Sequence, residues 1–264
     1  MFPGVSRDYL MTPLTLSLIV GGFVGLASGY LGSLMVLRKM SLVGDALTHV
    51  ALPGLAVGLI FHFNPFFGAF GALLLAIILI WLIEHRSKLS TETLVGIFFA
   101  TSLSIGLLIT PQPELLEALF GDISKTLLVE TILAAILSVV AIITVHQIYN
   151  RLVLGTMSND LASSVGIKTK KIDFIFLLIV ALIVALGIKI VGSLLMGGLV
   201  IIPAAAGKNL SRNLTAYGGF SALFGLASAT GGVYLASLLH FSPGPVVVLT
   251  SAAIFFLSLI FRKG

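Results

Sequence analysis

Long apolar runs separated by short polar connections dominate the pattern of this chain. The apolar residues are contiguous and do not alternate with polar ones, as they would in the strands of a membrane β-barrel. Lipid satisfies no backbone hydrogen bonds, so continuous apolar segments cross a bilayer as helices. The pattern therefore predicts an all-α fold, a polytopic integral membrane helical bundle.

A helix needs about twenty apolar residues to cross the hydrocarbon core of a bilayer. Nine segments approach or exceed that length, and we predict spans at 14–37, 42–60, 66–83, 94–110, 127–146, 174–190, 192–207, 214–239 and 246–261. The seventh segment is short and the second contains charged groups, so about nine spans are expected, with eight as the alternative. All of them belong to a single transmembrane domain over residues 1–264.

The basic residues gather in alternate connections, and this pattern predicts the orientation. When Arg38 and Lys39 are placed in the cytoplasm, alternation of the spans puts twelve of the 15 Lys and Arg residues on that side. Only Arg7, Lys125 and Lys189 fall on the outer side. Because cytoplasmic loops carry an excess of Lys and Arg, we predict an N-out, C-in topology. A nucleic-acid-binding face would form one basic cluster, so nucleic acid is not an expected partner.

Composition excludes several classes of protein. With 58% hydrophobic and 9% charged residues, the chain differs from a soluble domain, in which about a quarter of the residues are charged. It contains no cysteine, which excludes disulfides and thiolate ligands. The H-E-x-x-H, G-x-S-x-G and G-x-x-x-x-G-K-[ST] motifs are absent, so we do not expect an enzyme. Uphill transport would need an ion gradient or a separate ATPase.

The longest connection on the predicted inner side covers residues 149–173, and its middle is typical of a short helix. Ser158 or Asn159 can cap the N-terminus of this helix, and Gly166 stands where a terminating glycine is expected. Asp160 lies in its first turn. Its small apolar face consists of Leu161, Ala162 and Val165. Two interpretations remain open, a surface helix lying on the membrane and a docking element for a cytoplasmic partner.

Glycines recur at helical spacing in the first two spans. Gly21, Gly25 and Gly29 are each four residues apart and share one helix face, as do Gly54 and Gly58. Small residues at this spacing let helix backbones approach closely in lipid. We therefore expect both faces to pack tightly against neighbouring helices.

Asp45 and His49 are the strongest candidates for chemistry. They stand four residues apart in the second span, so their side chains leave the same helix face. A carboxylate oxygen with an imidazole nitrogen suits zinc, manganese or iron(II). Ionisable groups inside a span cost a few kcal/mol each, and they mark functional sites by default. The alternative is an Asp–His hydrogen bond that only holds helices together.

Two prolines extend this hypothesis. Pro53 has no N–H for the carbonyl of His49, which leaves a further oxygen beside the pair. Pro203 frees the carbonyl of Leu199 and is expected to kink a short helix, with a role in gating or in packing. Two side-chain ligands are too few for a four-coordinate site. Either another span or a twofold-related copy would have to complete it.

Other ionisable residues of the spans are weaker candidates. Histidines at span ends are more often satisfied at the interface than bound to a ligand, and acidic groups there reach the headgroup region. We therefore predict ordinary interfacial roles for His62, His240, His146, Glu130 and Asp173.

Four stretches together resemble the ABC-3 family of metal-ion permeases. They are MSLVGDALTHVALPG at 40–54, NDLASSVGI at 159–167, KIVGSLLMGGLVIIPAAA at 189–206 and SPGPVVVL at 242–249. They occur in family order and cover nearly the whole chain. The Asn64-Pro65-Phe66 turn and the last stretch look closer to zinc permeases, whereas the Leu-Pro-Gly after His49 looks closer to manganese permeases.

The resemblance implies a permease of type II-like importer architecture in a bacterial plasma (inner) membrane. It implies a homodimer, two cytoplasmic ABC ATPase subunits and an extracytoplasmic metal-binding protein. It also implies a transported divalent metal, zinc first and manganese or iron otherwise, and no covalently bound cofactor. Asp45 and His49 match the metal pathway of the family. The matching ATPase-docking residues are Asn159, Asp160, Leu161, Ala162, Val165, Gly166 and Ile167.

Two other functions stay open on the residues alone. One is a permease for a metal chelate such as a siderophore or cobalamin, which would need a wide apolar cavity. The other is a membrane assembly subunit that transports nothing.

Overall fold

The computed structural model describes residues 13–87, 89–110, 118–121 and 127–261. Throughout these residues every regular element is a helix, which confirms the predicted all-α fold. The helices are α1 (Pro13–Leu37), α2 (Ser41–Val50), α3 (Leu52–Ile60), α4 (Pro65–Arg86), α5 (Thr91–Ile109), α7 (Leu128–Met157), α8 (Asn159–Ser164), α9 (Thr169–Val191), α10 (Met196–Leu210), α11 (Leu214–Leu239) and α12 (Pro243–Ile260).

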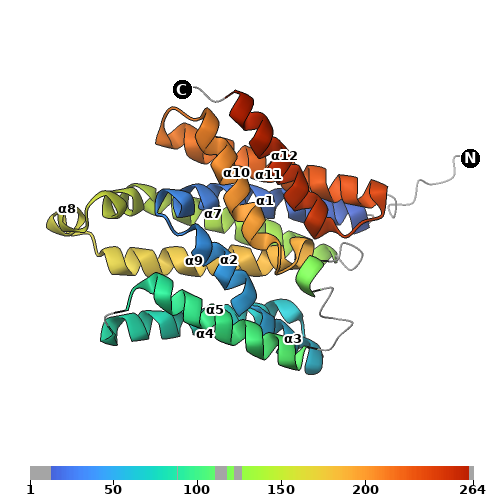
Figure 1. Ribbon diagram of the computed structural model, residues 1–264, viewed down its shortest axis with the longest axis horizontal. Coiled ribbons are helices and arrows are strands. Elements are labelled where there is room, and N and C mark those ends of the chain that lie inside the picture. Colours follow the sequence, from blue (N-terminus) through green and yellow to red (C-terminus); the bar gives the residue numbers. More distant parts are fainter. Residues whose placement is uncertain (1–12, 88, 111–117, 122–126, 262–264) are drawn as a thin grey trace, which may run out of the picture.

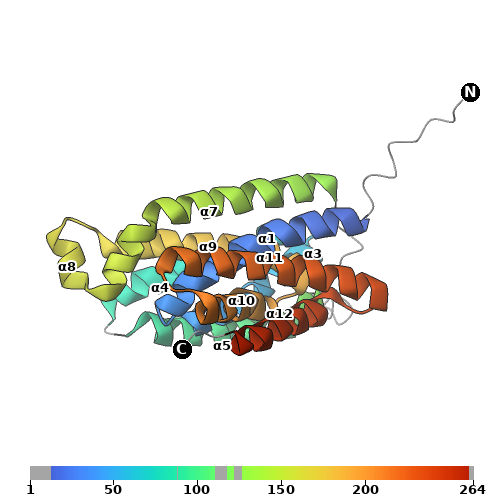
Figure 2. The ribbon, with the colours of Figure 1, turned by 90° about the horizontal axis from the view of Figure 1, so that it is seen from above.

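Most of the helices lie along the long axis of the molecule (Figure 1). Viewed from above, α7 lies along one edge of the bundle and α5 with α12 along the other, with α1 and α9 between them (Figure 2). The short helix α8 stands at one end, which we call the α8 end (Figures 1 and 2). Helix α1 begins at the opposite end.

Eight of the described segments are long and apolar enough to cross a membrane, with α2 and α3 counted as one span. Helix α10 has 15 residues. At 1.5 Å per residue it is about 22 Å long, less than the ~30 Å hydrocarbon core. Of the two predicted counts, eight is therefore the number of full-length spans in the described chain. The segment predicted at 192–207 is too short because Gly192 and the turn after it stand outside the helix.

Helix α10 nevertheless connects the two ends of the bundle. Just before it, the Ser193 N–H donates to the carbonyl of Ala118 over 2.8 Å, in the connection between α5 and α7. Near its last turn, Asn209 Nδ2 donates to Ser258 Oγ in α12 over 2.9 Å. The described chain therefore passes between the two ends nine times, once through a short helix.

The N-out, C-in orientation remains a prediction from the basic residues. Of these, Arg7, Lys88, Lys125, Arg262 and Lys263 lie outside the described residues. This orientation assigns the α8 end of the bundle to the cytoplasm.

Helix α2 lies between two groups of helices. Helices α1, α10, α11 and α12 pack together in one group, and α3, α4 and α5 form the other (Figure 1). Helix α2 contacts both α10 of the first group and α5 of the second. Any side chain on α2 is therefore close to the junction of the two groups.

The glycine face of α1 packs directly on α11. A Cβ atom on Gly25 would overlap the carbonyl oxygen of Gly225, and one on Gly29 would overlap the carbonyl oxygen of Ser221. Gly54 in α3 makes the equivalent close contact with α4. Both glycine faces predicted from the sequence are thus confirmed as sites of close backbone approach, as is usual between helices in lipid.

The predicted connection at 149–173 is largely helical. Helix α7 extends 30 residues to Met157, and α9 begins at Thr169. The apolar run of α7 ends before the helix does. The helix continues past that run because a helix that leaves the membrane persists in water if its residues favour it. Helix α8 therefore lies between the end of α7 and the start of α9, and it stands beyond the spans at the α8 end (Figures 1 and 2).

The caps predicted for α8 are confirmed. Ser158 Oγ accepts the N–H of Leu161 over 3.2 Å at the N-terminus. Gly166 adopts a positive φ of 77°, and the Ile167 N–H donates to the carbonyl of Ala162 over 3.0 Å. This is the hydrogen bond of a Schellman motif, which needs a glycine-like conformation just past the helix.

Substitution of Gly29 by alanine should destabilise the bundle. Alanine normally favours a helix over glycine by about 1 kcal/mol, but here the new methyl group would meet the backbone of α11. We expect Gly29→Ala to lower the free energy of unfolding by about 1–3 kcal/mol, the usual cost of overpacking. The measurement is the midpoint of thermal unfolding in detergent.

The matched control is Gly71→Ala in α4, where an added Cβ has no atom within 4 Å. Its midpoint should be unchanged or higher. Equal midpoints for the two variants would contradict the close approach of α1 and α11.

Candidate functional site

Helix α2 presents Asp45 and His49 on one face. It begins at Ser41, directly after a tight corner in which Lys39 has a φ of 59°. Asp45 is half-buried, and His49 is buried with 7% of its surface exposed. Both predicted residues therefore lie inside the bundle, one turn apart.

The carboxylate of Asp45 lies against α10. A Cβ atom added to Gly197 would stand 2.9 Å from Asp45 Cα and would overlap Oδ1 of the carboxylate. The Asp45 side chain thus occupies the space that the side chain of any residue other than glycine would need at position 197. Gly197 was not among the predicted site residues, although a glycine inside a helix usually indicates a close approach.

The imidazole of His49 lies against α5. Its ring meets the ring of Phe99 edge-on, with centroids 5.2 Å apart and an interplanar angle of 70°. Its Nδ1 atom is buried and has no hydrogen-bond partner among the described residues. A buried polar atom without a partner is uncommon in proteins and calls for an explanation. A ligand that approaches this nitrogen would provide one.

The structural alternative for the pair required a hydrogen bond between its two side chains. Within the part of the chain that the structure describes, no hydrogen bond joins Asp45 to His49. The only polar side chain bonded to Asp45 there is Thr48, and its Oγ1 donates to the backbone carbonyl over 2.6 Å. Both functional groups are therefore available to a third group.

Pro53 interrupts the span beside the pair. Helix α2 ends at Val50, and α3 begins at Leu52 with the proline in its first turn. The Ala51 N–H between them points at the carbonyl oxygens of both Leu47 and His49. The His49 carbonyl that Pro53 leaves without its usual donor is thus partly engaged by Ala51.

Pro203 is buried in the middle of α10. The helix continues through it, and its second turn holds the Leu199 carbonyl that the proline leaves without a donor. Gly197 lies on the same helix, six residues earlier. Pro203 therefore lies on the helix that contacts Asp45, and Pro53 lies on the helix that follows His49; neither contributes a side-chain ligand.

A third protein ligand is missing from the described residues. Nowhere in them do three or more His, Cys, Asp or Glu side chains form a group that could hold a metal ion. His62 and His240 are exposed at helix ends with positive φ. His146 Nδ1 lies 3.2 Å from the hydroxyl of Tyr30. The pair is therefore half of a coordination site at most.

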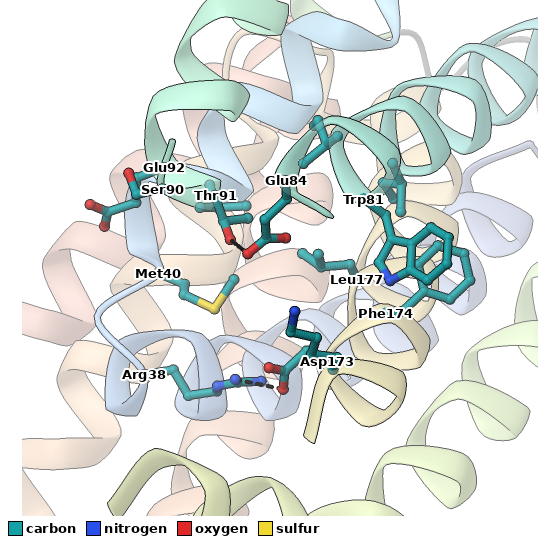
Figure 3. A pocket seen from close by; sticks show the side chains of 14 residues that line it. Arg38, Met40, Trp81, Glu84, Ser90, Thr91, Glu92, Asp173, Phe174 and Leu177 are labelled. Atoms are coloured by element: carbon teal, nitrogen blue, oxygen red, sulfur yellow. Dashed lines mark hydrogen bonds and ion pairs between the residues drawn. The ribbon is translucent and has the colours of Figure 1, made fainter. Parts of the chain in front are cut away.

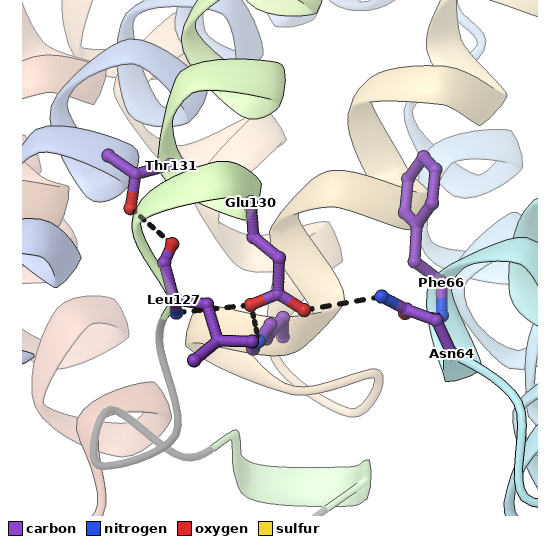
Figure 4. A network of polar contacts seen from close by, with 6 residues as sticks. Asn64, Phe66, Leu127, Glu130 and Thr131 are labelled. Atoms are coloured by element: carbon purple, nitrogen blue, oxygen red, sulfur yellow. Dashed lines mark hydrogen bonds and ion pairs between the residues drawn. The ribbon is translucent and has the colours of Figure 1, made fainter.

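Glu130, for which the sequence suggested only an interfacial role, holds together the end of the bundle opposite α8 (Figure 4). Its carboxylate forms an ion pair with Lys189 of α9, and it accepts the Leu127 N–H over 3.2 Å. Its other oxygen accepts from Asn64 Nδ2 over 3.3 Å. Asn64 in turn caps α4 by accepting the N–H of Phe66. One carboxylate thus joins α7, α9 and the start of α4.

Asp173 also has a specific partner at the α8 end. Arg38 Nη2 donates to Asp173 Oδ1 over 2.6 Å, and this ion pair lines a cavity of about 310 Å³ between α1, α2, α4, α5 and α9 (Figure 3). Sequence reasoning missed this pair because 135 residues separate its members. The only signal was that each charge stands at a span end.

The residues predicted to dock an ATPase differ in exposure on α8. Leu161 and Val165 are 56% and 62% exposed, whereas Ala162 is fully buried. The predicted apolar face is wrong in this respect, because consecutive helix residues point about 100° apart. Asp160 and Gly166 are exposed, Ile167 is half-buried, and Asn159 begins the helix. The outward surface of α8 is thus apolar at two positions.

Comparison with known proteins places the chain in a family. The model of the ABC 3 transport family matches residues 11–262. The chain belongs to this family. The match confirms the resemblance carried by the four sequence stretches, and it includes the helix that bears Asp45 and His49.

Individual relatives of the ABC 3 family agree over nearly the full length. The chain is 34% identical to the high-affinity zinc uptake system membrane protein ZnuB of Haemophilus influenzae, over 94% of this chain and 97% of the relative. It is 27% identical to the manganese transport system membrane protein MntC of Listeria monocytogenes, over 93% and 89%. It superposes on a chain of PsaBC from Streptococcus pneumoniae in complex with Fab with a TM-score of 0.83, at 26% identity and 94% and 91% coverage.

Proposed function

We propose that this chain is the membrane permease subunit of an ATP-driven importer that moves a divalent transition metal, with zinc as the first candidate and manganese or iron as alternatives. The observation that carries this proposal is the pair of half-buried Asp45 and buried His49, in which the Nδ1 atom of His49 has no hydrogen-bond partner among the described residues. Among the described residues, neither of these two side chains forms a hydrogen bond with the other.

The chemistry of the pair fits such a cargo. A carboxylate and an imidazole together bind borderline divalent ions, and zinc in proteins is most often four-coordinate. One chain supplies two side-chain ligands, so two copies related by a twofold axis would supply four. An ion held by a site that forms only between copies can also be released when the copies move.

The position of the pair supports passage of an ion. Asp45 contacts α10 in one group of helices, and His49 contacts Phe99 of α5 in the other. A shift of the two groups of helices relative to each other would change what covers the Asp45 carboxylate and the His49 imidazole, which stay together on α2. Only 17% of the most apolar 18-residue stretch of α5 is buried inside the chain, which leaves a large surface for lipid or for the second copy.

The relatives support zinc over manganese. This chain is 34% identical to the zinc uptake protein over the aligned residues and 27% identical to the manganese transport protein. Histidine is a more common ligand of zinc than of manganese, for which oxygen ligands are preferred. A permease for a bulky chelate would have no use for a buried imidazole nitrogen.

The remaining partners follow from the family and from α8. We propose that two cytoplasmic ATPase subunits dock on α8 of the two copies, and that an extracytoplasmic metal-binding protein delivers the ion at the opposite end. The exposed Leu161 and Val165 supply an apolar contact for the ATPase. The membrane would then be the plasma (inner) membrane of a bacterium.

Removal of either ligand should abolish transport. We expect Asp45→Asn and His49→Ala to lower zinc accumulation in cells by at least about tenfold, the lower range for disturbed metal sites. Accumulation of zinc, manganese and iron is measured in parallel, and the metal that falls identifies the cargo.

The control for this experiment is Thr48→Val on the same buried helix, because the Thr48 hydroxyl bonds only to the Asp45 backbone. It should stay within about twofold of the parent, since such a local bond contributes only ~1 kcal/mol. Full accumulation of all three metals by Asp45→Asn would remove the basis of the proposal.

Gly197 should be required for the position of the carboxylate. In Gly197→Ala the new methyl group would displace Asp45, so we expect zinc accumulation to fall several-fold while the amount of protein in the membrane stays near normal. Gly198→Ala is the matched control, because its methyl group would meet only the end of the Val248 side chain, at 3.2 and 3.4 Å, and that of Ile202 at 3.6 Å. If both variants transport equally, the contact between α10 and Asp45 has no role in transport.

The surface of α8 should hold the ATPase. We expect Leu161→Glu to reduce co-purification of the ATPase with the permease by about tenfold, because a charge would be buried in the contact without a partner. Phe61→Glu is the control, because Phe61 is 71% exposed at the opposite end of the bundle. Normal co-purification of Leu161→Glu would exclude this surface as the docking site.

A further inference from the structure

Arg38 holds an unusual position at the corner between α1 and α2. Its side chain is only 13% exposed, and its guanidinium lies over the ring of Phe176 in α9, 5.7 Å from the centroid. Nη2 donates to Asp173 Oδ1, while Nη1 is buried without a hydrogen-bond partner among the described residues. Arginine and carboxylate groups often pair through two parallel bonds. This pair uses one, from Nη2.

The corner that bears Arg38 is rigidly connected to the candidate metal site. Its backbone is held by the bonds from Arg38 N–H to Leu34 O over 2.9 Å and from Met40 N–H to Met35 O over 2.8 Å. Helix α2 begins one residue later, and Asp45 lies in its second turn. A displacement of Arg38 would therefore displace the start of the helix that positions Asp45.

Asp173 is connected to α8 in the same way. It lies in the second turn of α9, whose first residue, Thr169, donates its N–H to the carbonyl of Ile167 over 3.1 Å. Ile167 in turn donates to the carbonyl of Ala162 in α8 over 3.0 Å. A short hydrogen-bonded path thus leads from α8 to the carboxylate that holds Arg38.

The cavity beside the ion pair provides space for movement. Its opposite wall is formed by the ends of α4 and α5, joined by the bond from Thr91 Oγ1 to Glu84 Oε1 over 2.8 Å (Figure 3). Close-packed interiors do not allow helices to shift freely. A cavity of about 310 Å³ at this point leaves space between the corner of α1 and α2 and the ends of α4 and α5.

We infer that the Arg38–Asp173 contact transmits movements of α8 to the helix that carries Asp45 and His49. The two residues are positioning residues and do not touch the ion. This inference rests on the proposed function, because it takes α8 as the surface on which the ATPase acts. The Asp173 side chain is 41% exposed, and ion pairs that reach solvent contribute about 0–1 kcal/mol of net stability, so stability alone gives the contact little purpose.

The test measures zinc uptake and ATP hydrolysis together. The complete transporter, with its ATPase and its metal-binding protein, is reconstituted in lipid vesicles with Arg38→Gln or Asp173→Asn in the permease. We expect ATP hydrolysis to continue while the zinc transported per ATP falls about tenfold, which corresponds to ~1.4 kcal/mol of lost coupling. Zinc binding by the same purified variants should equal that of the parent.

Two further variants keep the test decisive. The exchange of charges in Arg38→Asp with Asp173→Arg restores an ion pair and should recover more than half of the lost ratio. Arg38→Lys retains the charge in case the neutral variants do not assemble, and it should lower the ratio less. The control is Glu130→Gln, which breaks an ion pair of similar partial exposure at the opposite end and should leave the ratio normal.

A different result would overturn the inference. If uptake and hydrolysis fall in the same proportion, or if only the midpoint of thermal unfolding changes, the Arg38–Asp173 contact is structural. Failure of the proposed function would look different, because Asp45→Asn would then transport and bind zinc normally whatever the Arg38 variants do.

Discussion

The Asp45 carboxylate depends on the absence of a side chain at Gly197, and this contact constrains the rest of the bundle. A charged group inside a span is costly, so it persists only where the helices leave it a polar or open environment. Helix α10 must therefore lie close to α2 without filling the space beside it. The same helix is in direct backbone contact with α1, because a Cβ on Gly32 would overlap the carbonyl oxygen of Val200. Glycines on both sides thus hold α10 between α1 and α2.

The ionisable side chains at the two ends of the bundle differ in their partners from those in its centre. Lys189 near the end of α9 pairs with Glu130, and Asp173 near its start pairs with Arg38. Helix α9 is therefore anchored by an ion pair at each end, whereas the central His49 Nδ1 has no hydrogen-bond partner among the described residues. This distribution separates the ion pairs that hold the helices in place from the two side chains that we propose as ligands of an ion.

Membership of the ABC 3 transport family gives this arrangement its context. A site built from two ligands in each chain, at the junction of two groups of helices, suits passage better than storage. Tight structural zinc sites use four protein ligands from one chain.

The sequence by itself determined the spans, the shared face of Asp45 and His49, the glycine faces and the caps of α8. All of these depend on residues within a few turns of each other, where helical spacing and hydrophobic length are sufficient. It did not reveal Gly197 as the contact of Asp45 or Arg38 as the partner of Asp173, and it placed Ala162 on the wrong side of α8. Those features depend on which helices are neighbours and at what distance. Only the tertiary structure decides this, because lipid is as apolar as the side chains of a neighbouring helix, so hydrophobicity does not tell which helices are neighbours.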